Sequence, residues 1–165
     1  MPTPAFIARL RTRIGNDLLL VPTVVVIARD SSGRVLLVQD SDSGHWTLPG
    51  GIIEPDEVPA DAAVREVWEE AAVSVELTRL IGVIGGKGCS RTYANGDQLA
   101  WVATVFGARI TGGTLAADGS ETTDARFFLD AELLSLSLNP HCRLFFGAEQ
   151  KAAHAGFFEP PTWVP

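Results

Sequence analysis

Disulfide chemistry, membrane spans and an excess of positive charge are all missing from this 165-residue sequence. Its two cysteines, Cys89 and Cys142, are too few for a disulfide framework or a zinc site, and isolated thiols suit a reducing compartment. No apolar run reaches the roughly 18 residues of a membrane span, and the N-terminus lacks the basic-then-apolar pattern of a signal peptide. We therefore expect a cytoplasmic protein that does not interact with a membrane.

Positive charge is scarce, because 13 lysines and arginines face 20 acidic residues and leave a net charge of −7. Broad electrostatic binding to nucleic acid or to an anionic membrane needs a basic surface, so both partners are excluded. A polyanionic substrate would need local cations, which a bound metal, Arg65, Lys87 and Arg91 could supply. The length suits one domain with its own core, and we find no internal repeat.

The most informative stretch is residues 50–73, where a glycine pair runs into a predicted helix. Pro59 suits the first position of a helix, and the absence of glycine after it predicts a helix of about 14 residues. At roughly 100° per residue, one arc of this helix is apolar and the opposite arc is acidic. The apolar arc, which we expect to pack, comprises Ala60, Ala63, Val64, Val67, Trp68 and Ala71. The acidic arc comprises Glu66, Glu69 and Glu70.

The acidic arc allows two interpretations. Like charges at these spacings cost about 0.2–0.5 kcal/mol per pair, a cost that a bound cation would reverse, and carboxylates together with substrate phosphates suit Mg²⁺. The alternative is a solvated helix face on which Arg65 pairs with Glu69. Gly50 and Gly51 favour the first interpretation, because paired glycines let backbone amides or carbonyls approach a ligand closely.

The order of these residues resembles the signature of the Nudix family. Gly51 is followed at the family's spacing by Glu57, Arg65-Glu66-Val67, Glu69-Glu70, and then Ala72-Val73. One signature position differs, since Ala72 stands where the family usually has glycine, and we expect altered geometry at the helix exit without loss of chemistry. The resemblance implies an α+β fold, an α/β/α sandwich with a mixed sheet, over roughly residues 18–153.

The resemblance also implies an activity: hydrolysis of a nucleoside diphosphate linked to another group X by Mg²⁺-assisted attack of water on phosphorus, with Mn²⁺ as a substitute metal. Glu66, Glu69 and Glu70 would hold the metal, with the Gly50 carbonyl as a further ligand. Glu66 or a late-loop acid would orient or deprotonate the water. Glu121 is our candidate for that acid, and Asp118 and Asp124 compete with it.

Further residues would support these groups or bind the substrate. Arg65 would pair with a signature glutamate and fix its rotamer, and Glu57 would act similarly near the loop. The expected substrate-binding set is Gly51, Glu57, Lys87, Arg91 and Tyr93. The layout is most similar to small bacterial Nudix proteins labelled ADP-ribose pyrophosphatases, so a nucleoside triphosphate and a nucleotide-sugar or ADP-ribose-like compound are both candidate substrates. The alternatives are a nucleotide-binding or regulatory module without turnover and an interaction protein.

The remaining sequence predicts a single domain made of residues 1–16 as an N-terminal helix, 18–153 as the core and 154–165 as a tail. Hydrophobic runs predict strands over 18–28, 35–38, 73–83, 98–109 and 125–129, and a short helix over 130–136. Asn139 and Pro140 begin a predicted helix that extends to about residue 154 and buries Leu144, Phe145 and Phe146. We expect the aromatic, proline-rich tail to dock on this subunit or on a partner, so a homodimer is a candidate assembly.

Overall fold

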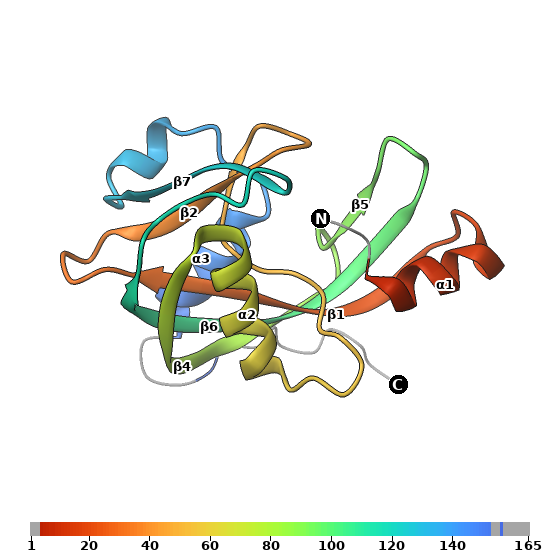
Figure 1. Cartoon of the computed structure of the whole chain (residues 1–165), viewed down its shortest axis with the longest axis horizontal. Coiled ribbons are helices and arrows are strands. Elements are labelled where there is room, and N and C mark those ends of the chain that lie inside the picture. Colours follow the sequence, from red (N-terminus) through yellow and green to blue (C-terminus); the bar gives the residue numbers. More distant parts are fainter. Residues whose placement is uncertain (1–3, 153–155, 157–165) are drawn as a thin grey trace.

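The computed structural model describes residues 4–152 and residue 156, and it consists of one mixed sheet with helices on its two faces (Figure 1). The helices are α1 (Ala5–Ile14), α2 (Pro59–Ala71) and α3 (Cys142–Lys151), with one short 3₁₀ helix, η1 (Glu132–Ser135). The strands are β1 (Leu19–Arg29), β2 (Val35–Asp40), β3 (Trp46–Thr47), β4 (Val73–Ile84), β5 (Ser90–Thr92), β6 (Gln98–Gly113) and β7 (Thr122–Phe128).

The sheet is organised around β1 and β6, which run parallel over their whole paired length, from Leu19 beside Leu99 to Arg29 beside Arg109. The order along the sheet is β3-β2-β1-β6-β4, while β5 pairs with β6 and β7 pairs with β2. The other pairings between these strands are antiparallel. The Asn95-Gly96 turn joins β5 to β6, in agreement with the hairpin chemistry of that dipeptide.

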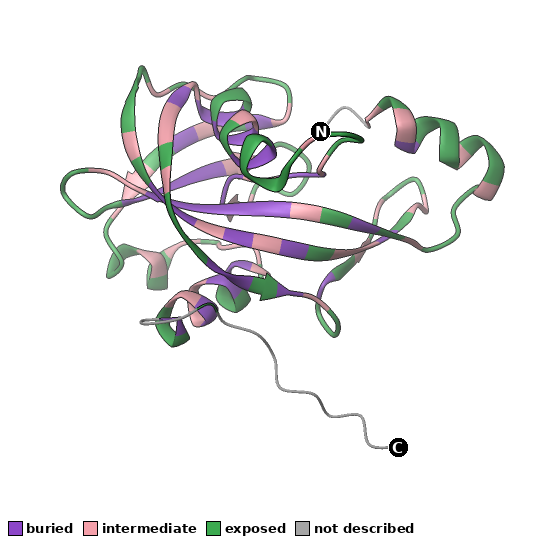
Figure 2. Ribbon diagram, turned by 90° about the horizontal axis from the view of Figure 1, so that it is seen from below, coloured by how far each residue is buried: buried purple, intermediate pink, exposed green. Residues whose placement is uncertain are grey.

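Alternating residues of the central strands point to opposite faces of the sheet and belong to two hydrophobic cores. On one face, Val24 and Val26 pack with Val67 of α2; on the other, Val25 and Ile27 pack with Phe145 of α3. Figure 2 shows the resulting buried band along the middle of the sheet. The predicted α+β class and the α/β/α sandwich are therefore confirmed.

The N-terminal helix α1 lies beside the end of the sheet that carries the glycine pair. Its Ile7 is buried against Val21, Ile52 and Leu99, and Arg11 donates a hydrogen bond to the Gln98 carbonyl. No helix in the described ranges is long and apolar enough to cross a membrane. The tail prediction falls outside the described residues, apart from Gly156.

Several local predictions need correction. β6 continues through Gly113 instead of ending near Arg109, because Val73 and Ser74 of β4 pair with its last two glycines. The predicted helix over 130–136 is the short 3₁₀ turn η1, and α3 begins at Cys142 and ends at Lys151. Leu144 is 40% exposed, because α3 turns Phe145 rather than Leu144 toward the sheet.

Candidate active site

The glycine loop is held against β1 by backbone hydrogen bonds. The Val26 N–H donates to the Pro49 carbonyl and the Val24 N–H donates to the Gly51 carbonyl, both at 2.9 Å. A Cβ atom added to Gly50 would lie 2.2 Å from the Val24 carbonyl oxygen. Only glycine fits there, and the Gly50 N–H is turned to the C-terminal part of α2, where it donates to Oε2 of Glu70 at 3.2 Å.

The helix that carries the acids begins at Pro59 and ends at Ala71, close to the predicted length. Ala72 follows in the left-handed conformation, with φ 53° and ψ 30°, and its N–H donates to the Trp68 carbonyl. The expectation of altered geometry at the helix exit is therefore wrong. Alanine adopts the backbone conformation that suits glycine, and the chain turns directly into β4.

The buried face of α2 differs from the predicted arc. Glu66 and Glu70 are only 4% and 8% exposed, whereas Trp68 is 54% exposed. The buried apolar residues of the helix are Ala62, Ala63, Val67 and Ala71. The face is displaced because the glycine loop covers α2 from one side, so two of the three acids lie under protein. Glu69 alone stays in solvent, with a side chain that is 56% exposed.

Arg65 holds this acidic group together. Its Nε and Nη2 atoms donate to the two carboxylate oxygens of Glu57 at 2.8 and 2.9 Å. Nη1 donates to Glu66 at 2.8 Å and to Glu69 at 3.0 Å, and Nη2 also donates to the Ile52 carbonyl. All five N–H donors of the guanidinium are thus used, which fixes three carboxylates relative to the loop. The predicted pairing of Arg65 with signature glutamates is present, and the supporting role of Arg65 and Glu57 stays a prediction.

The buried carboxyls are hard to ionise without a further cation. Burial, only partly offset by Arg65, raises the pKa of Glu66 to about 7. Burial and then the charge of Glu66 raise the pKa of Glu70 well above its ordinary value, although the Gly50 N–H opposes the shift. Glu57 behaves oppositely, because its hydrogen bonds from Arg65 lower its pKa. A divalent cation beside Glu66 and Glu70 would stabilise the ionised forms of both.

The loop before β7 brings a further acid to this group. Burial raises the pKa of Asp118, but hydrogen bonds from the Ser120 hydroxyl and from the N–H groups of Thr122 and Glu121 outweigh burial and lower it. Asp124 is paired with Arg126 at 2.6 Å and lines neither cavity. Asp118 lines the cavity beside Glu66, whereas Glu121 lines both that cavity and the one beside Glu70. Burial raises the pKa of Glu121 as well.

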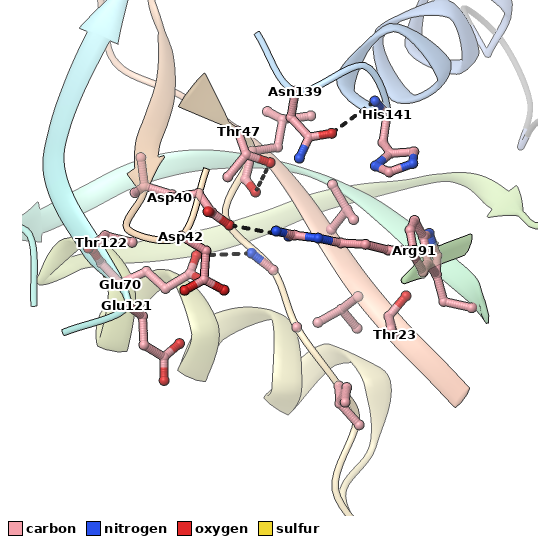
Figure 3. Close-up of a pocket in the computed structure, with 18 of the residues that line it drawn as sticks. Thr23, Asp40, Asp42, Thr47, Glu70, Arg91, Glu121, Thr122, Asn139 and His141 are labelled. Atoms are coloured by element: carbon pink, nitrogen blue, oxygen red, sulfur yellow. Dashed lines mark hydrogen bonds and ion pairs between the residues drawn. The ribbon is translucent and has the colours of Figure 1, made fainter. Parts of the chain in front are cut away.

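A cavity of about 210 Å³ opens between the glycine loop, the sheet and the start of α3 (Figure 3). Of the predicted site residues, Gly50, Gly51, Glu70, Arg91, Tyr93 and Glu121 line it. Arg65, Glu66 and Glu69 line an adjoining cavity with Glu121. Lys87 is exposed in the loop after β4 and lines neither cavity, and Glu57 is bound to Arg65 instead.

The sequence analysis missed several residues that line this cavity: Asp40, Asp42, Trp101, Asn139 and His141. In Figure 3, Asp40 and Asp42 lie on the side of Glu70 and Glu121, whereas Asn139 and His141 lie away from those acids, near the start of α3. The Trp101 and His141 rings meet edge to face with 4.8 Å between centroids. Burial, and then the charge of Arg91, lowers the pKa of His141, so its imidazole is uncharged at neutral pH. The Asn139-Pro140 helix start was visible in the sequence, but nothing local pointed it to the cavity.

Arg91 is the only lysine or arginine among the described lining residues of this cavity. Its guanidinium lies 4.8 Å from the centre of the Tyr93 ring and 3.8 Å from Oδ2 of Asp40. Figure 3 shows it reaching across the cavity from β5 toward Asp40. Aromatic surfaces therefore lie at one end of the cavity, carboxylates at the other, and a single strong cation between them.

The donor set at the acidic end fits a hard divalent cation, because it consists of carboxylate oxygens, those of Glu66 and Glu70 with raised pKa values, beside the glycine loop. Among the described residues, no three Asp, Glu, His or Cys side chains already converge at metal-binding distances. Arg65 explains this, because it draws the carboxylates of Glu66 and Glu69 toward itself.

Comparison with known proteins gives a consistent picture. The family model described as "NUDIX domain" matches residues 19–145. A MutT-like protein of Streptomyces ambofaciens is 39% identical over 99 residues, which are 60% of this chain and 56% of the relative. A putative 8-oxo-dGTP diphosphatase of Bacillus subtilis is 36% identical over 102 residues, which are 62% of either chain. The chain thus spans 56–62% of the length of these curated relatives.

The solved structure of an ADP-ribose pyrophosphatase from Streptococcus suis has a TM-score of 0.64 to this chain. The two are 24% identical, and the match covers 84% of this chain and 96% of the other. At this identity the likeness concerns the fold alone.

Proposed function

Because the chain belongs to the NUDIX domain family, we propose that it is a pyrophosphohydrolase that uses a divalent metal to cleave a nucleoside diphosphate linked to a group X. The observation that carries the proposal is the burial of Glu66 and Glu70, at 4% and 8% exposure, beside a glycine loop that opens into an aromatic cavity. Two neighbouring buried carboxylates are costly for a soluble protein unless a cation joins them.

Glu66, Glu69 and Glu70 would hold the metal, Mg²⁺ or Mn²⁺, with the Gly50 carbonyl as a further ligand. When bound, the metal neutralises diphosphate charge, polarises the P–O bonds and lowers the pKa of the attacking water. The chain's own groups orient these ligands: Gly50 N–H holds Glu70, and Arg65 holds Glu66 and Glu69. Arg65 also ties the helix to the loop through the Ile52 carbonyl.

Glu121 is our candidate for the base that accepts a proton from the attacking water. It lines both cavities, so it faces the acidic group and the substrate cavity together. A raised pKa brings a carboxylate closer to the operating pH, which favours general-base catalysis. Glu66 is the second candidate, and its fixed contact with Arg65 suits a metal ligand better than a base.

The cavity suits a nucleotide. Trp101, His141 and Tyr93 offer ring surfaces for a base, and Arg91 lies between them and the acids, where a phosphate would lie. One strong cation is enough for a diphosphate whose other charges are neutralised by metal. The substrate class, a nucleoside triphosphate or a nucleotide-sugar or ADP-ribose-like compound, is in keeping with the names of the Bacillus subtilis relative and of the fold neighbour.

The test is hydrolysis of a panel with Mg²⁺ and with Mn²⁺: ADP-ribose, NADH, ribo- and deoxynucleoside triphosphates including oxidised ones, and dinucleoside polyphosphates. For the preferred compound, Glu70→Gln should lower kcat/KM by about 100-fold or more while the protein stays folded. Glu76→Gln, on the exposed side of β4, is the matched control and should keep full activity. Equal activity of wild type and Glu70→Gln would contradict the proposed metal site.

The alternative is a nucleotide-binding module without turnover, and it predicts binding of panel members with no product. The homodimer and the cytoplasmic location expected from the sequence stay predictions. Light scattering on the purified chain measures the first, and its outcome does not bear on the proposed chemistry.

A further inference from the structure

Thr23 interrupts an apolar row. Alternate residues of β1, namely Val21, Thr23, Val25 and Ile27, lie on one face of the sheet, and its three apolar members are buried in the cores of that side. The Thr23 hydroxyl oxygen is buried and has no hydrogen-bond partner among the described residues. Buried side-chain polar atoms in folded proteins are nearly always paired, so this hydroxyl calls for an explanation.

The backbone of Thr23 does not supply that explanation. Its main chain pairs with Ile52, which follows the glycine loop, and this pairing needs no hydroxyl. Valine would serve the strand and the core at least as well, since it has the same branching at Cβ. The hydroxyl therefore has no role within the described part of the fold.

The position of Thr23 suggests what its partner is. Thr23 lines the cavity of the candidate active site, and Figure 3 shows its side chain projecting from β1 toward Arg91. In the parallel register, Val21 lies beside Trp101 and Thr23 beside Ala103, so Thr23 is one step along the same face from the Trp101 ring. A flat group that lies against Trp101 would thus bring its edge near this hydroxyl.

We propose that Thr23 is a substrate-reading residue whose hydroxyl forms a hydrogen bond with the edge of a nucleobase seated against Trp101 and His141. This inference rests on the proposed function for the identity of the ligand as a nucleotide. Phosphates belong at the other end, near the metal ligands and Arg91, whereas the end with Trp101 is aromatic and uncharged. Every nucleobase has polar atoms on its edge, and a hydroxyl can donate or accept, so Thr23 fixes the base without choosing one.

The test is Thr23→Val, which removes the hydroxyl and keeps the shape. Because no hydrogen bond within the described protein is lost, the melting temperature should stay the same or rise. Because the bond to the base is lost, KM should rise about 3- to 10-fold at unchanged kcat, and affinity for a nucleoside monophosphate should fall by a similar factor. A lower melting temperature with unchanged affinity would assign the hydroxyl a structural role and overturn the proposal.

Thr122→Val is the matched control for stability. Thr122 lines the same cavity, is 2% exposed, and its hydroxyl donates to the Glu70 carbonyl at 2.9 Å. The same substitution there removes a hydrogen bond within the protein, so it should lower the melting temperature. A melting temperature that falls for Thr122→Val and does not fall for Thr23→Val would distinguish the paired hydroxyl from the unpaired one.

Direct binding separates this proposal from the proposed reaction. AMP, GMP, CMP, UMP and dTMP are titrated by calorimetry into metal-free wild-type protein and Thr23→Val, with no hydrolysis required. Weaker binding to the variant supports the inference even where the panel shows no turnover. Equal binding to both proteins overturns the inference even where hydrolysis is found, because the hydroxyl would then pair with water or with nothing. The absence of binding of every monophosphate to wild type also overturns it.

Discussion

The C-terminal end of α2 can be tested at Ala72, because the strain there depends on a single methyl group, the Cβ atom of a residue in the left-handed conformation. Its φ of 53° and ψ of 30° belong to the left-handed region, where a Cβ costs roughly 1–2 kcal/mol. Ala72→Gly removes that strain but gives the unfolded chain more freedom, which offsets about 0.4–1 kcal/mol. The net expectation is a stabilisation of roughly 0.5–1 kcal/mol, and for a chain of this length about 1–4 °C in melting temperature.

The assay is equilibrium urea unfolding together with a thermal melt, on wild type and variant at one pH and without metal. Ala60→Gly is the control, since Ala60 is exposed in the first turn of the same helix and glycine there should cost up to about 1 kcal/mol. Activity of Ala72→Gly should equal that of wild type, because the exit geometry is kept. A variant that is less stable than wild type would refute the assignment of strain to Ala72.

Two further predictions concern the acidic group. Burial raises the pKa of Glu66 from 4.5 to about 7, so between these pH values the native metal-free protein binds one proton more than the unfolded chain. The free energy of unfolding therefore falls by up to about 3 kcal/mol as pH rises from 4.5 to about 7. Mg²⁺ should therefore raise the melting temperature more at about pH 8 than at about pH 5.5, and the reverse order would contradict the metal site. Arg65→Lys loses the paired bonds to Glu57, so kcat/KM should fall about 10- to 100-fold, while Arg109→Lys, at an exposed pair, should leave it unchanged.

Local chemistry was enough to predict most elements, because their signals lie within a few residues. Pro59 at a helix start and Asn95-Gly96 at a hairpin act through their own backbone preferences. The faces of α2 were predicted less well. Trp68 was expected to pack and is 54% exposed, while Glu66 and Glu70, which were assigned to the arc opposite the packed one, are buried. Periodicity locates an arc on a helix, but the segments that cover the arc come from elsewhere in the chain.

The cavity shows the same limit over longer separations. Arg91 could be predicted because it belongs to the hairpin around Asn95-Gly96, whereas Lys87, four residues earlier, lies within the glycine-rich loop 85–88, whose direction no local rule gives. Trp101 and Asn139 meet at the cavity only because β6 runs parallel to β1 and α3 closes over both. No pairwise spacing in the sequence carries that information.

Thr23 combines a local signal in the sequence with a meaning that depends on the fold. Its signal was local, since a single hydroxyl within the alternation of Val21, Val25 and Ile27 is an exception to an apolar row. Strand chemistry alone treats threonine as an ordinary β-branched residue, so the exception has no meaning until the fold gives the hydroxyl a buried place without a partner. A polar atom that the fold leaves unpaired indicates a ligand more directly than a charged one does. Charged side chains such as Arg65 can satisfy one another, whereas this hydroxyl has no hydrogen-bond partner among the described residues.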